Sequence, residues 1–371
     1  MRVKDTKKRG MRRRRLALLL PGHNEELIIA TTIHSAVAAG LKIENIFVVD
    51  DDSNDQTREI ALRFLPKENV LTVPRSGKAQ AVMLAINHFN IVERYTWIHV
   101  ADADSIFCPD YFRIYLKHLD AKRYSAAVGF VQSMRGNWIA TYRSFSYTYG
   151  QHIFRRLQAW MGAIAVLPGP VTCFKSDILK DLNFSTNSLT EDFDLTLQIH
   201  RKKLGSIRFI PEAINYTQDP RTVSDFIQQS LRWQRGFFQG VKKYNIGLRP
   251  HMIDAGVGYQ MAESMYYFFQ MLFLLPLLLV ATHDWRTFFT IMGADYAAIV
   301  VLAIFSAIAA RRLSILSSLP YFYVLRFIEL GVFAWAFIEV IVLKRHAAAP
   351  HGWRTEGRRY EITTNDVSSL Q

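Results

Sequence analysis

The stretch "WIHVADAD" at residues 97–104 decides how this chain folds. Its first half is a short apolar run with the length of a buried β-strand. Its second half places the carboxylates of Asp102 and Asp104 directly after that run. The same order occurs at 45–51, where "NIFVVDD" also ends in carboxylates. We therefore expect two buried strands whose carboxyl ends are acidic.

Helical patterns alternate with short apolar runs over the first hundred residues. The apolar runs lie at 16–21, 45–51, 70–74 and 97–104, and segments with apolar residues at helical spacing lie at 26–40, 55–65 and 78–89. Gly40 is positioned to end the first of these helices. This alternation predicts a doubly wound parallel α/β sheet, which binds ligands beyond the carboxyl ends of its strands. Neither GxGxxG nor GxxxxGK[ST] occurs, which argues against a dinucleotide oxidoreductase or a P-loop enzyme.

The pattern loosens after this region. "SAAVGFVQ" at 125–132 predicts a further strand, 138–161 is an aromatic-rich helical region, and "LPGPVTCF" at 167–174 predicts a loop. Longer helices are expected at 189–205, where the helix would end at a glycine, and at 223–240. These elements complete a soluble head.

Positive charge is concentrated at the start of the chain. Residues 1–15 carry nine Lys or Arg against one Asp, within a net charge of +13. Such an arm is usually solvated. We expect it to meet an anionic membrane surface rather than nucleic acid, because the mostly apolar residues 264–343 imply a bilayer. The apolar run 16–20 is shorter than the roughly 7–15 residues of a signal-peptide core, so the head is expected to be cytoplasmic. Two cysteines, Cys108 and Cys173, fit a reducing compartment without a disulfide or zinc framework.

Two apolar segments follow the head. Residues 264–282 hold no charged side chain and have about the length of one bilayer crossing. A second candidate lies at 287–310, with Asp295 as its one acidic residue. Basic residues precede the first segment and follow the second. Two crossings would leave both basic groups on the cytoplasmic side, as the positive-inside rule expects.

The third apolar stretch, 313–343, has more than one possible topology. It contains Arg326, Glu329 and Glu339, and the basic residues that follow it would lie outside after a single crossing. Two crossings need about forty residues, so an interfacial or re-entrant segment is the open alternative. In a helix, Arg326 and Glu329 could form an i, i+3 ion pair.

Carboxylates at the expected strand ends suit a metal and a nucleotide. Strand alternation would send Asp102 and Asp104 to one side, where they could hold Mg²⁺ or Mn²⁺ while phosphate oxygens complete the shell. Asp50, Asp51 and Asp52 offer acceptors for a base or ribose. The plainer alternatives are loop carboxylates at the first position and a solvated turn with a helix cap at the second.

Two further clusters have residue types suited to group transfer. In "TEDFDL" at 190–195, Asp192 could be a general base whose pKa is raised by other carboxylates, although acidic residues also complement a helix start. Gln229, Arg232 and Trp233 share one helical face. The arginine could clamp a pyrophosphate, and the indole could stack on a sugar. An amphipathic interfacial helix would explain this second cluster equally well.

Taken in order, these motifs resemble the membrane-bound processive enzymes of glycosyltransferase family 2, such as cellulose, chitin, hyaluronan and poly-N-acetylglucosamine synthases. Enzymes of the family that move one sugar to a polyprenyl phosphate generally lack the QxxRW motif, which matches "QSLRW" at 229–233 here. The resemblance implies a GT-A-like nucleotide-binding domain and a UDP-sugar donor. It rests on "PGHNEE" (21–26), "VVDDDSNDQT" (48–57), "GKAQA" (77–81), "DAD" (102–104), "TED" (190–192) and "QSLRW" (229–233).

The resemblance also implies a role for each matching residue. Asp192, with Glu191 beside it, would be catalytic. Asp102 and Asp104 would meet the diphosphate and a Mg²⁺ or Mn²⁺ ion, with Asp104 the more direct ligand. The nucleotide-binding residues would be Pro21, Asn24, Glu25, Asp50, Asp51, Lys78 and Asp102. The acceptor and diphosphate side would be lined by Gln229, Arg232 and Trp233. The segment "WRTEGR" resembles a gating segment that would close over the nucleotide through Trp353, Thr355 and Arg358.

These inferences combine into an expected organisation and reaction. The order is a basic arm (1–15), a cytoplasmic glycosyltransferase domain (16–250), interfacial and transmembrane helices (251–346) and a tail (347–371) at the inner membrane. The expected reaction is inverting transfer of N-acetylglucosamine from a UDP-sugar to a growing polysaccharide. A glucose polymer, or a single transfer to a lipid or polyprenyl acceptor, is the alternative. Because few helices are available for a channel, a small membrane partner subunit or a second copy would complete it. Membrane lipids are expected partners, and nucleic acid is not.

Overall fold

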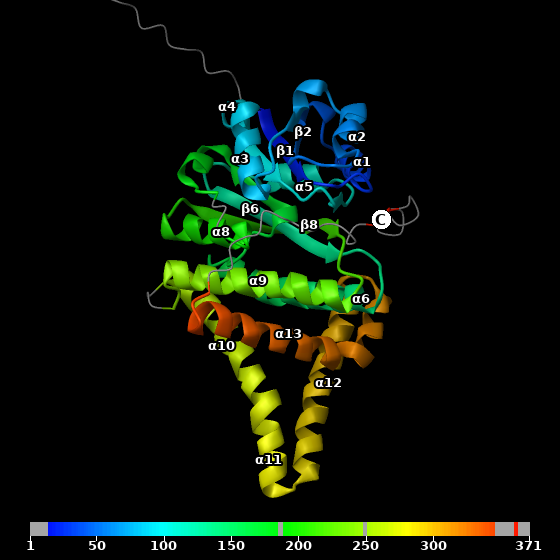
Figure 1. The fold of residues 1–371 in the computed structure, drawn as a ribbon, viewed down its shortest axis with the longest axis vertical. Coiled ribbons are helices and arrows are strands. Elements are labelled where there is room, and N and C mark those ends of the chain that lie inside the picture. The colour runs from blue at the N-terminus through cyan, green and yellow to red at the C-terminus, as the bar shows by residue number, and fades with distance from the viewer. Residues whose placement is uncertain (1–13, 185–187, 248–250, 346–359, 363–371) are drawn as a thin grey trace, which may run out of the picture.

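The computed structural model describes residues 14–184, 188–247, 251–345 and 360–362. A head built on one eight-stranded sheet lies above a layer of helices, and a two-helix hairpin projects from that layer (Figure 1). The strand order in the sheet is β3-β2-β1-β4-β7-β6-β8-β5.

The first half of the sheet follows the sequence prediction. Gly40 lies two residues past the end of α1 (Ile29–Ala38) with a φ of 97°, a conformation that costs glycine little, so its predicted place at this helix end is confirmed. The parallel neighbours are β1 (Arg14–Gly22), β2 (Ile46–Asp50), β3 (Val70–Thr72) and β4 (Tyr95–Val100), which alternate with α1 (Ile29–Ala38), α2 (Thr57–Phe64) and α3 (Lys78–His88).

The second half of the sheet is mixed. β7 (Thr172–Lys175) is antiparallel to both β4 and β6 (Tyr124–Ser133), whereas β8 (Ser206–Thr217) is parallel to β6 and β5 (Ile106–Phe107) is antiparallel to β8. An all-parallel sheet is therefore wrong for this half, because β7 runs in reverse between β4 and β6. Since β4 and β6 point the same way, the carboxyl ends of β1, β2, β4, β6 and β8 share one edge.

Alternation along β1 builds a core on both faces of the sheet. Leu16, Leu18 and Leu20 are at most 3% exposed and pack on the face covered by α1 and α2. Ala17 and Leu19 are fully buried on the opposite face, which α3 covers. This period of two is the one expected of a strand with helices on both sides.

The remaining helices of the head include two that carry candidate site residues. α8 is shorter than the predicted helix at 189–205 because Lys203 and Gly205 have positive φ, and α9 runs past the predicted end of 223–240. A π-helical turn, Gly150–Arg155, joins α6 to α7. The bounds are α4 (Ile91–Arg94), α5 (Tyr111–His118), α6 (Trp138–Tyr149), α7 (Arg156–Trp160), α8 (Glu191–Arg201) and α9 (Val223–Tyr244).

The hairpin consists of two apolar helices. α10 (Met252–Phe269) continues through a π-helical turn into α11 (Leu275–Thr282), and α12 (Trp285–Ala309) returns toward the head. In the described part of the chain, these two continuous helices are long and apolar enough to cross a membrane. Their apolar side chains face largely outward, as shown by Leu277 and Val280, which are 64% and 69% exposed. The two predicted apolar segments fall within this hairpin.

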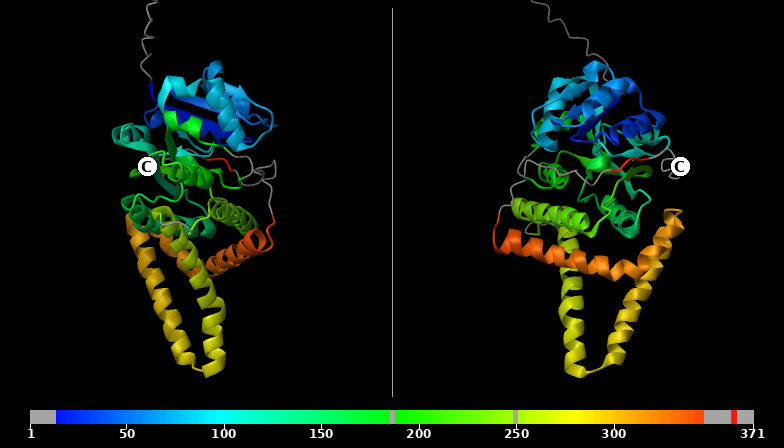
Figure 2. Two further views of the ribbon diagram at one scale, coloured as in Figure 1. Left: turned by 90° about the vertical axis from the view of Figure 1, so that its left-hand side faces the viewer. Right: turned by 45° about the vertical axis from the view of Figure 1, so that its right-hand side comes forward.

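The third apolar stretch does not continue the hairpin. Its main helix, α13 (Phe322–Phe337), crosses beneath α9 (Figures 1 and 2). The predicted pair of Arg326 and Glu329 is confirmed, with an N–O separation of 3.9 Å. Farther along, Ile362 is 6% exposed and packs in a cluster with Ile28 of the head. This stretch therefore packs against the head instead of extending the hairpin, and its position relative to a membrane stays a prediction.

Candidate active site

The loops that follow β1, β2 and β3 are tied together at the acidic edge of the sheet. The buried carboxylate of Asp51 accepts hydrogen bonds from the backbone N–H groups of Ser76 (2.8 Å) and Gly77 (2.9 Å). It also pairs with Arg75 at 2.9 Å. Asp51 therefore orders the loop that leads into α3, and its contact with a nucleotide base stays a prediction.

Four more residues of the predicted nucleotide site lie at the same edge. Asn24 accepts a backbone hydrogen bond from the loop after β2 at 2.9 Å, and the backbone N–H of the buried Glu25 donates to the first residue of α2 at 2.7 Å. Asp50 accepts from the backbone of its own turn at 3.2 Å, and Pro21 lies near the end of β1. These bonds fix the shape of the edge at which a ligand would bind.

Lys78 joins the acidic edge of the sheet to the start of α8. Its ammonium forms a short ion pair with Asp102 and lies 3.1 Å from the Glu191 carboxylate. Burial opposes the charged amine, but Asp102 and Glu191 outweigh that effect and raise the pKa of Lys78. A Cβ on Gly169 would lie 2.6 Å from the Lys78 nitrogen, so the backbone of this loop covers the pair closely.

Asp192 is the second residue of α8, and its pKa is raised. Burial and the neighbouring carboxylate of Glu191 raise the pKa of Asp192 to about 6, although Lys78 and Arg232 act in the opposite direction. One carboxylate oxygen accepts the N–H of the next residue at 2.8 Å. A carboxylate with this pKa is ionised at neutral pH and is a better proton acceptor than an ordinary aspartate.

The third carboxylate of the "TEDFDL" cluster has a different environment. Asp194 is 2% exposed and contacts Lys243 at 2.6 Å, the Tyr244 hydroxyl at 3.0 Å and Gln198 at 2.8 Å. Two of these partners lie at the end of α9. Asp194 therefore fastens α8 to α9 instead of facing a ligand.

The two carboxylates of the Asp-x-Asp sequence have different neighbours. β4 has ended before them, and the backbone oxygen of Asp102 accepts from Ser105 at 3.1 Å, so they lie in a turn. Strand alternation is therefore the wrong basis for placing them on one side. Asp102 pairs with Lys78, whereas the buried Asp104 is close enough to Asp219 to act on its pKa.

Asp219 follows β8 and was not among the predicted site residues. It is 4% exposed, and burial raises its pKa to about 6, although the charge of Arg143 and the hydrogen bond donated by the Tyr147 hydroxyl act against burial. Asp104 and Asp219 offer oxygen ligands of the kind that Mg²⁺ and Mn²⁺ accept. Among the described residues, no group of three or more His, Cys, Asp or Glu side chains is placed to hold a metal. A cation at this pair would thus need phosphate or water oxygens as well.

α9 approaches the start of α8 through two glycines. A Cβ on Gly236 would lie 2.2 Å from the Thr190 hydroxyl, and one on Gly240 would lie 2.5 Å from the Phe193 ring. Carbon atoms in contact are normally about 3.5–4.0 Å apart, so only glycine permits this approach. Arg232 adds a hydrogen bond of 3.2 Å to the backbone oxygen just before Thr190. The helices that carry the two clusters distant in sequence are thus in direct contact.

Gln229 and Trp233 contact α6 instead of α8. The Arg143 guanidinium lies 3.4 Å from the Gln229 side-chain oxygen and 4.8 Å from the centre of the Trp233 ring. Arg232, on the same helix, contacts the backbone ahead of α8. α9 therefore divides its predicted site residues between two neighbouring elements.

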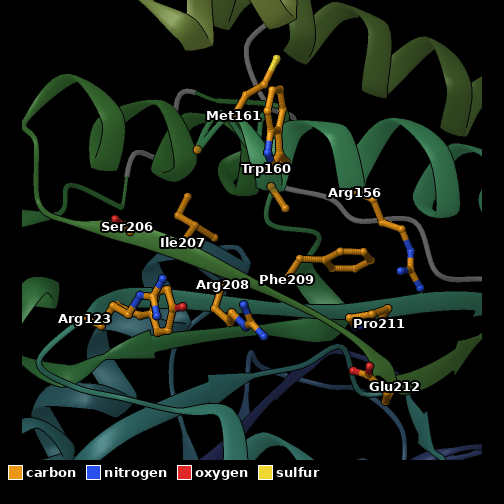
Figure 3. Close-up of a pocket in the computed structure, with 13 residues that line it drawn as sticks. Arg123, Arg156, Trp160, Met161, Ser206, Ile207, Arg208, Phe209, Pro211 and Glu212 are labelled. Atoms are coloured by element: carbon orange, nitrogen blue, oxygen red, sulfur yellow. The ribbon is translucent and has the colours of Figure 1, made fainter.

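A separate cavity lies at the amino ends of β6 and β8, the opposite end of these strands from Asp219. Its volume is about 640 Å³. Figure 3 shows Trp160 at one end, Arg208 on β8, and Arg123, which comes just before β6. No predicted site residue lines it, so it is not the site described above. The lining residues are Arg123, Tyr124, Arg156, Ala159, Trp160, Met161, Gly162, Ser206, Ile207, Arg208, Phe209, Pro211 and Glu212.

Sequence reasoning missed several residues around the site. Arg155 ends the π-helical turn, where burial lowers its pKa to about 10 while the charge of Asp192 acts in the opposite direction. Gly169, between two prolines, and Asp219, before a proline at a strand end, had local signals. Arg143 had none, because its partners come from other segments. The predicted gating residues, Trp353, Thr355 and Arg358, lie outside the described residues.

The sheet, the acidic edge and the contact between α8 and α9 can now be compared with known proteins. A family model described as glycosyltransferase-like family 2 matches residues 14–236, more than half of the chain. The chain belongs to glycosyltransferase family 2. Poly-beta-1,6-N-acetyl-D-glucosamine synthase of Staphylococcus epidermidis is 24% identical to this family member over 227 residues, which cover 60% of this chain and 54% of the relative. A probable glycosyltransferase of Bacillus subtilis is 28% identical over 239 residues, with 60% and 55% covered.

This glycosyltransferase spans about half the length of the curated relatives it matches. Among solved structures, a mannosyltransferase of Pyrobaculum calidifontis in complex with GDP-mannose and Mn²⁺ superposes with a TM-score of 0.56 at 16% identity. The match covers 87% of this chain and 88% of the other. The predicted fold class, a GT-A-like α/β domain followed by apolar helices, is therefore confirmed.

Proposed function

We propose that this family-2 enzyme is an inverting glycosyltransferase that adds N-acetylglucosamine from UDP-N-acetylglucosamine to a growing polysaccharide at a membrane. The choice of sugar is supported by the relatives named as poly-beta-1,6-N-acetyl-D-glucosamine synthases. The chain matches only part of those relatives, so polymerisation is part of the proposal.

The observation that carries the proposal is the environment of Asp192. It lies at the start of α8 with a pKa of about 6, near Lys78 and Arg232. On one side, Lys78 pairs with Glu191, the residue before Asp192, and with Asp102 at the acidic edge of the sheet. On the other side, α9 is in contact with the residue pair that precedes it. A base between a donor edge and an acceptor helix is the arrangement that sugar transfer requires.

In the reaction, Asp192 accepts the proton of an acceptor hydroxyl as that oxygen forms a bond to the anomeric carbon of the donor sugar. The bond from this carbon to the diphosphate breaks at the same time, and its electron pair leaves with UDP. In-line attack inverts the anomeric configuration. Lys78 and Arg232 supply positive charge toward the diphosphate, where negative charge develops.

A divalent cation fits the residues at Asp104 and Asp219, whose buried carboxylates offer hard oxygen ligands. When bound, Mg²⁺ or Mn²⁺ would stabilise the negative charge of the departing diphosphate. Asp102 pairs with Lys78, so its main role would be to orient that lysine.

The hairpin formed by α10, α11 and α12 would cross the membrane twice and leave the head on the cytoplasmic side. Its length, its apolar composition and its outward-facing side chains support this location. α13 would then lie at the membrane surface beneath α9. The arm at 1–15 would add attraction to anionic lipids.

A second candidate is the transfer of a single sugar to a lipid acceptor. It is favoured by the small number of candidate crossings, two in the described part of the chain, which do not by themselves enclose a channel for a polymer. A partner subunit or a second copy would be required for translocation under the first proposal and not under this one.

The test is sugar transfer by the full-length protein in membranes. Labelled UDP-N-acetylglucosamine, UDP-glucose and GDP-mannose are each supplied with Mn²⁺ or Mg²⁺, and the products are separated by size and by solubility in organic solvent. A long product from UDP-N-acetylglucosamine supports the proposal. A single sugar on extractable lipid establishes the second candidate. A polymer made from UDP-glucose would show that the donor sugar is glucose instead of N-acetylglucosamine.

A further inference from the structure

A buried arginine occupies the junction of α6, α9 and α13. Arg143 is 4% exposed, and its guanidinium donates to the Ser230 hydroxyl at 2.8 Å and to Gln229 at 3.4 Å, both on α9. It also donates to Glu329 of α13 at 3.3 Å. The same group lies 4.8 Å from the centre of the Trp233 ring. This one side chain of α6 therefore contacts two other helices and two of the residues predicted to line the acceptor side.

Glu329 completes this junction from the membrane-facing side. Its second oxygen accepts a hydrogen bond of 2.6 Å from the Tyr142 hydroxyl, and Arg326 lies 3.9 Å away on the same helix. A buried guanidinium requires a nearby carboxylate, because an unpaired charge in such a place is costly. Glu329 is thus the carboxylate that pairs with the Arg143 guanidinium, whose charge also acts on the buried Asp219.

The guanidinium in turn restricts the orientation of the Trp233 indole. A planar cation over an aromatic ring is held by electrostatic attraction and by flat packing, and it limits rotation of that ring. Gln229 is restrained by the hydrogen bond that its side-chain oxygen accepts. Both side chains therefore depend on contacts that begin at Glu329.

We propose that Arg143 and Glu329 are positioning residues for the acceptor, which set the orientation of Gln229 and Trp233 and make acceptor binding depend on the placement of α13. This inference rests on the proposed function, in which Gln229 and Trp233 line the acceptor side. The donor edge is built from different contacts, those of Asp51 with the loop before α3 and of Lys78 with Asp102.

The chain supplies a matched control at the same junction of helices. Arg235 of α9 pairs with Glu339, in the turn after α13, at 2.7 Å. This pair also links α9 to the third apolar stretch, but no described contact connects it to Gln229 or Trp233. Glu339→Gln therefore removes a comparable ion pair without disturbing the acceptor side.

The experiment measures Michaelis constants for donor and acceptor separately, with full-length protein in lipid nanodiscs. The donor is UDP-N-acetylglucosamine, and the acceptor probe is a short β-1,6-linked N-acetylglucosamine oligosaccharide. We expect Glu329→Gln and Arg143→Lys to raise the acceptor KM about tenfold, the size of one lost charge-assisted hydrogen bond, while the donor KM stays unchanged. Glu339→Gln should leave both constants near wild type.

A second readout does not depend on turnover. Glu329→Gln should change the intrinsic tryptophan fluorescence, and this change should disappear in a Trp233→Phe background. If Arg143→Lys fails to fold, Tyr142→Phe, which removes one hydroxyl bound to Glu329, replaces it in both assays.

Four outcomes would overturn the inference. Equal effects of Glu329→Gln and Glu339→Gln would show that only general packing is involved. Parallel rises in donor and acceptor KM would show that the substitution disturbs the whole active site and not the acceptor side specifically. If the wild-type protein elongates no oligosaccharide from any nucleotide sugar, the proposed function fails and this inference fails with it. A wild-type enzyme that is active and indifferent to Glu329→Gln refutes the inference alone.

Discussion

Gly236→Ala should separate catalysis from folding in this enzyme. The added Cβ would lie 2.2 Å from the Thr190 hydroxyl, 2.5 Å from its methyl carbon and 2.8 Å from its Cβ. Ordinary carbon contacts need about 3.5 Å or more, so α9 and the start of α8 must move apart by roughly 1 Å. Thr190 is two residues before Asp192, so the displacement reaches the base directly. A misplacement of about 1 Å typically costs on the order of 100-fold in rate.

The assay compares kcat for sugar transfer with thermal unfolding of the same purified protein. We expect kcat to fall by about 100-fold, while the free energy of unfolding decreases by about 1–3 kcal/mol, the usual cost of overpacking. Gly331→Ala is the matched control, because Gly331 lies in α13 with no atom within 4 Å of an added Cβ. Its kcat should match wild type.

Gly240→Ala sharpens the comparison on the same helix. Its Cβ would meet the Phe193 ring at 2.5 Å instead of the residues ahead of Asp192. It should therefore destabilise the protein to a similar degree and reduce kcat less. A Gly236→Ala variant with wild-type kcat, or one that loses activity only in proportion to Gly240→Ala, would refute the idea that α9 positions the base.

Three further predictions concern the carboxylates of the site. The rate of transfer should rise with pH to a plateau above about pH 6, because Asp192 must be ionised to accept a proton, and a pH-independent rate between 5 and 7 would contradict its role. Asp192→Asn should raise the melting temperature at neutral pH by removing up to about 3 kcal/mol of unfavourable ionisation, since its pKa is raised from 3.8 to about 6. That gain should shrink as the pH falls from about 6 toward 3.8, where the folded state binds a proton more readily than the unfolded chain, and a constant gain would rule out this cause. Asp219→Asn and Asp104→Asn should each weaken Mn²⁺-dependent UDP binding about tenfold or more, measured by calorimetry, and unchanged binding would remove the cation from this pair.

Local patterns in the sequence were sufficient for the first half of the sheet. Alternating strands and helices up to residue 104 predict parallel neighbours, because each short apolar run can be buried on both faces only in such a sheet. The strand β7 was missed in this way, because "LPGPVTCF" at 167–174 predicts a loop where Thr172–Lys175 forms a strand. "TCFK" at 172–175 is equally compatible with either direction, and only its position between β4 and β6 makes it antiparallel.

The candidate site shows the same division between local and tertiary information. "TED" and "QSLRW" identify residues with suitable chemistry, and the structure packs the helices that carry them against each other. The glycines that allow this contact, Gly236 and Gly240, look like ordinary helix glycines in the sequence. Arg143 and Asp219 were missed because burial and partners from distant segments, rather than spacing, give them their roles.

The Asp-x-Asp sequence lies beyond the reach of strand alternation. β4 ends at Val100, so alternation does not place Asp102 and Asp104 on the same side. In the turn that follows, one meets Lys78 and the other lies near Asp219. The residue types were informative, but their shared geometry could not be predicted from a two-residue spacing.

The most direct test of this account is a comparison of the wild-type enzyme with Asp192→Asn, using labelled UDP-N-acetylglucosamine and Mn²⁺. Donor binding and sugar transfer are measured on the same full-length preparations. We predict that the variant binds the donor as the wild type does and transfers no measurable sugar, because only the proton acceptor has been removed. Transfer by Asp192→Asn at a rate near wild type would contradict the assignment of the base and, with it, the proposed mechanism.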